Sequence, residues 1–130
     1  PCVIVSFSFD VSHDGTDLTT MMGINPEAAA EFAKTANADV IGINCGTNVD
    51  IDWAIKATKR FRATCDLPVM AQPNAGKPEL VGVETVYRQT PEEMASKVVE
   101  LAEAGASIIG SCCGSSPDTI AAMRRNLRGL

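Results

Sequence analysis

Apolar runs alternate with amphipathic segments four times along the chain. Short runs rich in valine, isoleucine, phenylalanine and alanine predict four strands, at residues 2–9, 39–44, 67–71 and 106–109. Each run precedes a segment whose apolar residues recur at helical spacing, and these segments cover about residues 26–36, 50–62, 91–104 and 117–127. Strands that alternate with helices favour parallel pairing through right-handed crossovers, so the pattern predicts an α/β fold.

The residues that open the last two helices are typical helix starts. Thr90-Pro91-Glu92-Glu93 combines a capping-box threonine and glutamate with proline in the first turn. Ser116-Pro117-Asp118 opens the final helix, in which Ile120, Met123 and Leu127 share one face. We therefore expect these three side chains to point inward.

Three cysteines follow predicted strands. Cys45 lies in Gly42-Ile43-Asn44-Cys45-Gly46, and Cys112 and Cys113 lie in Gly110-Ser111-Cys112-Cys113-Gly114. A catalytic zinc site takes three protein ligands and keeps a fourth position open, whereas a closed structural site takes four. Neighbouring residues in a strand point to opposite faces, so the adjacent pair can share one ion only where the backbone turns. The sequence thus predicts an open metal site formed by Cys45, Cys112 and Cys113.

Three segments carry a family resemblance. Asn44-Cys45-Gly46, then residues 72–78 (Gln-Pro-Asn-Ala-Gly-Lys-Pro), then residues 110–117 resemble in order and spacing the signatures of zinc-dependent homocysteine S-methyltransferase domains, with cobalamin-dependent methionine synthases the most similar. Serines at 111, 115 and 116 replace the usual glycine and two threonines. Whole domains of this family are (βα)8 barrels, which typically need ~250 residues. The resemblance therefore implies that residues 1–130 form one domain of four consecutive βα units, the C-terminal half of a TIM-type barrel with parallel strands.

The resemblance also implies an activity. Such a domain binds homocysteine as a zinc thiolate and methylates it to methionine, so the chain is expected to be a methyltransferase of the EC 2.1.1 class. Methylcobalamin, carried on another domain or a corrinoid protein, is the favoured donor, and betaine or S-methylmethionine are the alternatives. A second hypothesis is a non-catalytic zinc-binding half-barrel that needs a partner half. No catalytic residue is expected beyond the metal site.

The remaining polar residues and cysteines are candidates either for substrate contact or for a purely structural role. Asn74, Asn44 and Asp10 follow predicted strands and are candidate homocysteine contacts, but each would equally serve a turn or cap a loop. Cys2 and Cys65 are expected to be small buried hydrophobes. The single histidine, at position 13, lies in a polar segment and is not expected to bind metal. A Cys112–Cys113 disulfide would compete with zinc.

Composition and net charge indicate which classes of binding partner the chain lacks the charge to attract. A net charge of −5 and a pI near 4.8 argue against nucleic-acid or anionic-membrane binding. The apolar runs are shorter than a membrane span needs, and no secretory signal opens the sequence. Five cysteines suit a reducing compartment, so we expect a cytoplasmic protein. A half-barrel would leave two unpaired edges, which predicts either a homodimer or a separate N-terminal half as partner.

Overall fold

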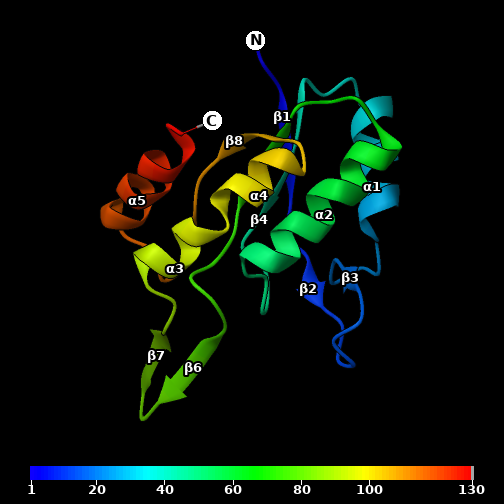
Figure 1. The fold of residues 1–130 in the computed structure, drawn as a ribbon. Coiled ribbons are helices and arrows are strands. Elements are labelled where there is room, and N and C mark those ends of the chain that lie inside the picture. Colours follow the sequence, from blue (N-terminus) through cyan, green and yellow to red (C-terminus); the bar gives the residue numbers. More distant parts are fainter. Residues whose placement is uncertain (130) are drawn as a thin grey trace.

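A four-stranded parallel sheet organises the computed structural model, which describes residues 1–129 (Figure 1). Its strands lie in the order β1 (Ile4–Phe7), β4 (Val40–Asn44), β5 (Val69–Gln72) and β8 (Ala106–Ile109). Five helices connect or follow them: α1 (Pro26–Thr35), α2 (Ile51–Thr64), α3 (Pro91–Ser96), α4 (Val98–Glu103) and α5 (Pro117–Leu127). The predicted α/β class and the parallel sheet are confirmed.

One face of the sheet is buried against the helices. Ile41 and Val69, which are paired across β4 and β5, have no exposed surface, and they share a core with alanines of α1 and with Phe61 of α2. Alanine at positions 29, 30 and 33 lets α1 approach closely, because its side chain adds little bulk. The other face is more open, since Ile4 and Ile108 remain 46% and 43% exposed.

Two hairpins interrupt the βα pattern. β2 (Asp10–Val11) pairs with β3 (Leu18–Thr19) after β1, and β6 (Pro78–Val81) pairs with β7 (Glu84–Tyr87) after β5. Both extend from the lower end of the sheet in Figure 1. The sequence analysis did not predict either hairpin, because strands of two or four residues with mostly exposed side chains give almost no periodic signal.

The predicted third helix is broken. α3 ends at Ser96 and α4 begins at Val98, with Lys97 between them at φ −107° and ψ 3°. The Lys97 ammonium lies 2.6 Å from both carboxylate oxygens of Asp52 on α2, so an inter-helix ion pair accompanies the break. The prediction of one continuous helix over 91–104 was wrong, although Met94 and Val98 stay buried as its spacing indicated.

Strand bounds and two burial predictions also need correction. β1 covers Ile4–Phe7 rather than 2–9, and β5 covers Val69–Gln72 rather than 67–71. Cys2 is exposed because it precedes the edge strand, whereas Cys65 is buried as expected. Ile120 is 45% exposed rather than inward, because α5 packs chiefly on α3 and leaves that side chain beside β8.

No helix of residues 1–129 is both long and apolar enough for a membrane crossing.

An arginine ties α1 and α2 to the first hairpin. Arg60 donates to both carboxylate oxygens of Glu27 at 2.5 and 2.6 Å and to Asp17 at 2.6 Å. Hydrogen bonds from Arg60 hold the pKa of Glu27 below its ordinary value against the opposing effect of burial. The pKa of Asp17 is lowered by the Leu18 amide and then by Arg60. Bidentate geometry makes this cluster stronger than an ordinary surface pair.

We expect Glu27→Gln to lower the free energy of unfolding at pH 7 by about 1 kcal/mol, the screened value for a half-exposed ion pair. A depressed pKa contributes stability above the unfolded-state value of about 4.3 and loses it as pH falls through the folded-state value. The difference between variant and wild type should therefore shrink at pH 3. Urea unfolding at both pH values measures it. Glu31→Gln, which removes only the exposed pair with Lys34, should change little at either pH.

Candidate metal centre

Three thiols meet at the carboxyl end of the parallel sheet. The sulfur of Cys45 lies 3.5 Å from that of Cys113, the sulfurs of Cys112 and Cys113 are 4.0 Å apart, and all three lie within 4.8 Å of one another. Among residues 1–129 this is the one group of three or more histidine, cysteine or acidic side chains with metal-binding spacing. The structure thus brings together the three cysteines that the sequence singled out.

Sheet hydrogen bonding continues into the loops that carry these thiols. Beyond β4, the Cys45 amide donates to the Gln72 carbonyl at 3.1 Å, and beyond β8 the Cys112 amide donates to the Pro73 carbonyl at 2.9 Å. Gln72 ends β5 and Pro73 follows it, so one segment at the end of β5 holds both cysteine loops. The backbone therefore fixes the loops before any ligand binds.

The Cys45 loop has left-handed backbone. Cys45 has φ +54° and the next residue, Gly46, has φ +91°. A β-carbon at Gly46 would lie 1.7 Å from the Phe9 carbonyl oxygen, so only glycine fits there. A non-glycine residue in the left-handed region costs on the order of 1–2 kcal/mol. This left-handed conformation places the Cys45 thiol at the end of the sheet.

The Cys112–Cys113 pair lies where β8 has ended and the chain turns, as sharing one ion requires. Cys112 is half-buried and Cys113 is exposed. Gly114 follows with φ +78°, and a β-carbon there would lie 2.2 Å from Cγ of Tyr87. The tyrosine ring of β7 thus packs directly on the glycine that ends the cysteine pair.

Asn74 joins the two cysteine loops. Its amide nitrogen donates to the Gly46 carbonyl at 2.9 Å, and its amide oxygen accepts from the Cys113 amide at 3.1 Å. The side chain is 2% exposed. These contacts match the turn interpretation. Contact with homocysteine stays a prediction.

The other two candidate substrate contacts also make backbone-ordering bonds. Asp10 accepts from the Thr47 amide at 2.7 Å, so its carboxylate orders the loop after Cys45. Asn44 accepts from the hydroxyls of Ser6 at 2.7 Å and Ser8 at 2.9 Å. Their contacts with substrate stay predictions as well. His13 lies in an exposed turn and does not belong to the cysteine cluster.

Cys45 and Cys112 differ in how readily their thiols ionise. Burial raises the pKa of Cys112 to about 11, and its sulfur neighbours Cys45 and Cys113 add to the rise. Burial also acts to raise the pKa of Cys45, but hydrogen bonds from Cys113 and from the Gly46 amide outweigh it and bring the pKa below its ordinary value. Cys45 therefore loses its proton before Cys112 does.

The donor set fits a zinc ion. Zinc–sulfur bonds of about 2.3 Å in a tetrahedron put ligand sulfurs ~3.8 Å apart, close to the 3.5 and 4.0 Å separations of Cys113 from its neighbours. Three sulfurs leave one tetrahedral position, and the exposure of Cys113 leaves the cluster accessible from solvent. Zinc and other thiophilic ions prefer such ligands.

Tyr87 lies at the site, although the sequence did not indicate it as a candidate site residue. Burial raises the pKa of its phenol, and the nearby Cys113 sulfur raises it further. The signal available in the sequence was weak, because a tyrosine six residues before the capping-box glutamate Glu93 matches no metal-site pattern. Its placement depends on the pairing of Tyr87 with Pro78 in the β6–β7 hairpin.

Comparisons with known proteins agree with this geometry. The family model described as homocysteine S-methyltransferase matches residues 1–127. A methionine synthase of Mycobacterium leprae is 32% identical over 104 residues, which cover 78% of this chain and 8% of that protein. Homocysteine S-methyltransferase 4 of Zea mays is 31% identical over 126 residues, covering 94% and 35% respectively. The chain thus spans about a third or less of the curated relatives it matches.

Solved structures share the fold. The apo form of the homocysteine methyltransferase MmuM from Escherichia coli aligns with a TM-score of 0.63 at 22% identity, covering 93% of this chain and 39% of that one. Its metallated form aligns with a TM-score of 0.60 at 23% identity, covering 92% and 34%. At these identities the alignments support the arrangement of strands and helices.

We expect Gly114→Ala to destabilise the protein more than Gly82→Ala. Both glycines have positive φ, so both changes carry a backbone cost of about 1 kcal/mol. A β-carbon at Gly82 meets no atom within 4 Å, whereas at Gly114 it meets the Tyr87 ring, which adds about 1–3 kcal/mol of overpacking. Urea unfolding of both variants measures the difference. Equal destabilisation would contradict close packing of Tyr87 on Gly114.

Proposed function

This chain belongs to the homocysteine S-methyltransferase family, and on that premise we propose that its cysteine cluster binds zinc and presents homocysteine for methylation to methionine. The observation that carries the proposal is the convergence of Cys45, Cys112 and Cys113 within 4.8 Å at the carboxyl end of the sheet. Residues 1–130 would form the C-terminal half of a (βα)8 barrel, and the three thiols follow the carboxyl ends of its strands, the face at which such barrels place their active sites.

The chemistry needs a sulfur nucleophile. A free thiol has a pKa near 8.5 and is mostly protonated at neutral pH. Bound to the three cysteine sulfurs, zinc would hold the homocysteine sulfur as a thiolate in the remaining position. Zinc fits this donor set because the separations of the Cys113 sulfur from those of Cys45 and Cys112, 3.5 and 4.0 Å, are close to the ~3.8 Å of a tetrahedral zinc site.

The protein's own residues would supply position and charge. The ordered loops hold the three cysteines in place, so little reorganisation is needed when a ligand arrives. Their combined negative charge favours an electron-rich substrate sulfur. That sulfur would form the new bond to carbon with its own electron pair, while the methyl donor keeps the pair of the bond that breaks. The thiol proton leaves to solvent beforehand.

Asn74, Asn44 and Asp10 are proposed to border the amino-acid head of homocysteine. Asn44 ends β4, Asn74 follows β5, and Asp10 begins β2 shortly after β1, so all three follow or end strands of the sheet that carries the thiols. Asn74 already uses one amide hydrogen and its oxygen for the two cysteine loops, which leaves a second hydrogen for a substrate carboxylate. Its first role would be to hold the ligands, and its second to orient the substrate.

Methylcobalamin on another domain or on a corrinoid protein is the donor we propose, in a cytoplasmic setting that keeps the thiols reduced. The similarity to methionine synthases of Mycobacterium leprae and Mycobacterium tuberculosis, both 32% identical, supports it. S-methylmethionine or betaine is the alternative donor, because the chain is also similar to a relative not named as a methionine synthase, homocysteine S-methyltransferase 4 of Zea mays. A zinc-binding half-barrel that is inactive without a partner half is the second candidate function, since the chain covers only part of its relatives.

We expect about one zinc per chain in protein purified with reductant, because three thiolates at zinc spacing form one site. Cys113→Ala should reduce the zinc content severalfold, because only two sulfurs remain. Cys2→Ala is the matched control and should keep full occupancy, since Cys2 is exposed at the start of the edge strand. Elemental analysis after dialysis measures both. Equal zinc in both variants would place the ion elsewhere.

We expect zinc-loaded protein to bind homocysteine and not homoserine, which carries oxygen in place of sulfur and is a poorer ligand for a thiophilic ion. Zinc-free protein should bind neither tightly. Isothermal calorimetry measures the four combinations. Methionine formation with methylcobalamin, S-methylmethionine or betaine then identifies the donor, and binding without turnover would favour the fragment hypothesis. Equal binding of homoserine would contradict the thiolate proposal.

A further inference from the structure

The Cys112–Cys113 pair lies in a tight turn. The Ser115 amide donates to the Cys112 carbonyl at 3.2 Å, which closes a four-residue turn. Gly114 is the third residue of this turn and has φ +78°, a positive value of the kind that a type II turn requires there. The two cysteines are therefore consecutive turn residues, and their side chains are free of the alternation that a strand imposes. The turn is thus what allows neighbouring sulfurs to join one cluster.

Two serine hydroxyls brace this turn. Ser115 Oγ donates to the Cys112 carbonyl at 2.6 Å, so that carbonyl accepts from both the amide and the hydroxyl of one residue. Ser111 Oγ donates at 3.1 Å to the Pro73 carbonyl, the same atom that accepts the Cys112 amide at 2.9 Å. A carbonyl oxygen has two lone pairs, so each of these two acceptors is filled. The hydroxyls thus complete the hydrogen bonding on both sides of Cys112.

The backbone groups of the second cysteine bond to the segment that follows β5. The Cys113 amide donates to Asn74 Oδ1 at 3.1 Å, and the Cys113 carbonyl accepts from the Ala75 amide at 2.9 Å. All four backbone polar groups of the two cysteines thus have partners in the part of the chain that the structure describes. Ser115 is the partner that does not belong to residues 73–75, so it holds the turn from its far end.

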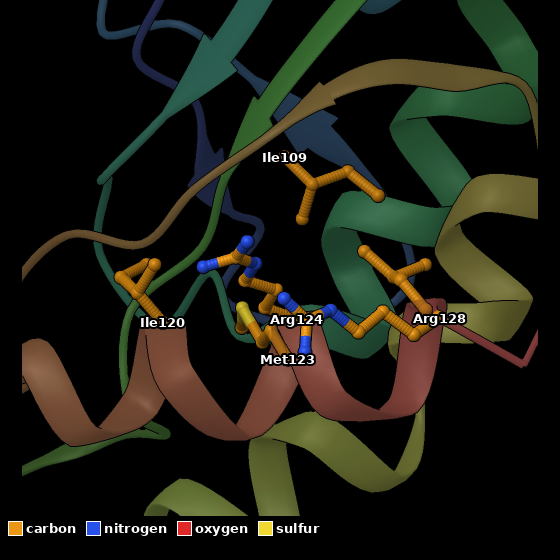
Figure 2. Close-up of a pocket in the computed structure, with 6 residues that line it drawn as sticks. Ile109, Ile120, Met123, Arg124 and Arg128 are labelled. Atoms are coloured by element: carbon orange, nitrogen blue, oxygen red, sulfur yellow. The ribbon is translucent and has the colours of Figure 1, made fainter.

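The strand and the helix on either side of the turn are held by packing. Ile109, the last residue of β8, extends toward α5 (Figure 2) and packs against both groups of buried residues. α5 begins at Pro117, and its Met123 is buried. Packing therefore fixes where the chain enters and leaves the turn, whereas hydrogen bonds fix the turn itself.

The two serines differ in how they relate to the family signature. Ser115 replaces a threonine, which also carries a hydroxyl, whereas Ser111 replaces a glycine, which has none. The Ser111 hydroxyl also lies 3.9 Å from the sulfur of Met94, a residue of α3 without exposed surface. Ser111 thus adds a contact between the cysteine turn and the helix layer that a glycine could not make.

We propose that Ser111 and Ser115 are positioning residues of the cysteine cluster, whose hydroxyls hold the turn in the metal-binding conformation before an ion binds. This role rests on the proposed zinc site and goes beyond it, because it assigns the order of the site to two side chains that are not among its three sulfur ligands. Each hydroxyl donates its one hydrogen to a backbone carbonyl, so each acts through the backbone of the cysteine turn.

The energetic basis is pre-organisation. A loop that also visits other conformations binds an ion with an affinity reduced by the fraction of time that it spends in the binding conformation. Loss of one neutral hydrogen bond shifts such an equilibrium about fivefold. Removing the Ser115 hydroxyl leaves the Ser115 amide on the same carbonyl, so the turn should loosen without unfolding.

Hydrogen exchange of the reduced, metal-free protein tests the brace itself. Ser111→Ala and Ser115→Ala should each speed the exchange of the hydrogen-bonded amides of residues 112–115 about fivefold, because each removes one hydrogen bond. Ser115→Thr keeps a hydroxyl and should exchange like the wild type. Ser96→Ala is the matched control, since it removes a hydroxyl bond of 2.7 Å to the Glu93 carbonyl within α3 and should leave these amides unchanged. Circular dichroism checks that each variant is folded.

Cobalt(II) binding tests the positioning role. Thiolate coordination gives cobalt intense absorption bands, so one titration reports both affinity and geometry, and competition with zinc then gives the zinc affinity. The double variant Ser111→Ala/Ser115→Ala should bind cobalt at least ~10-fold more weakly than the wild type, as loss of outer-shell partners does. Its spectrum at saturation should match that of the wild type because all three sulfurs remain, whereas Cys113→Ala should give a different spectrum.

The two measurements separate this role from the zinc proposal. A wild type that binds neither cobalt nor zinc would overturn the zinc site, and faster exchange in the serine variants would still support the brace. Unchanged exchange in Ser111→Ala and Ser115→Ala would overturn the brace. Equal cobalt affinity of the wild type and the double variant, or an equal loss in Ser96→Ala, would overturn the positioning role.

Discussion

The short segment at the carboxyl end of β5 is the constraint on which the site depends. Gln72, Pro73 and Asn74 accept or donate hydrogen bonds to the loops that carry Cys45, Cys112 and Cys113, through two backbone carbonyls and one side-chain amide. The middle strand of the site thus extends sheet pairing to both of its neighbours beyond their last strand residues. A shift of this segment would move all three thiols at once. A shift of either cysteine loop alone would move only Cys45 or only the Cys112–Cys113 pair.

The ordered cysteine loops cost free energy, which the buried core beneath them offsets. Cys45 occupies a left-handed conformation, Gly46 leaves no room for a β-carbon, and three thiols lie close enough that ionising one disfavours ionising the next. The core beneath is well formed, with Ile41, Ile43 and Val69 buried against α1 and α2. Local strain above a rigid sheet is typical of sites whose geometry must exist before the ligand binds.

The sequence predicted what local pattern and spacing determine. Four strand–helix rounds followed from apolar periodicity, and the meeting of Cys45 with Cys112 and Cys113 followed because parallel strands end at one edge. Features set by contacts distant in sequence were missed. The break at Lys97 is accompanied by an ion pair with Asp52 on another helix, and the exposure of Ile120 depends on how α5 docks on α3. Tyr87 reaches the cluster only through hairpin pairing.

The β6–β7 hairpin has an exposed tip, and its base packs beside the thiol cluster. Val83 at the tip is almost fully exposed, and Gly82 has free space around it, while Tyr87 at the base of the same hairpin packs on Gly114. Four residues of strand span ~14 Å, so tip and cluster are near one another yet not in contact. A fluorophore or epitope inserted at the tip would therefore report on the state of the cluster from outside it, with every thiol left intact.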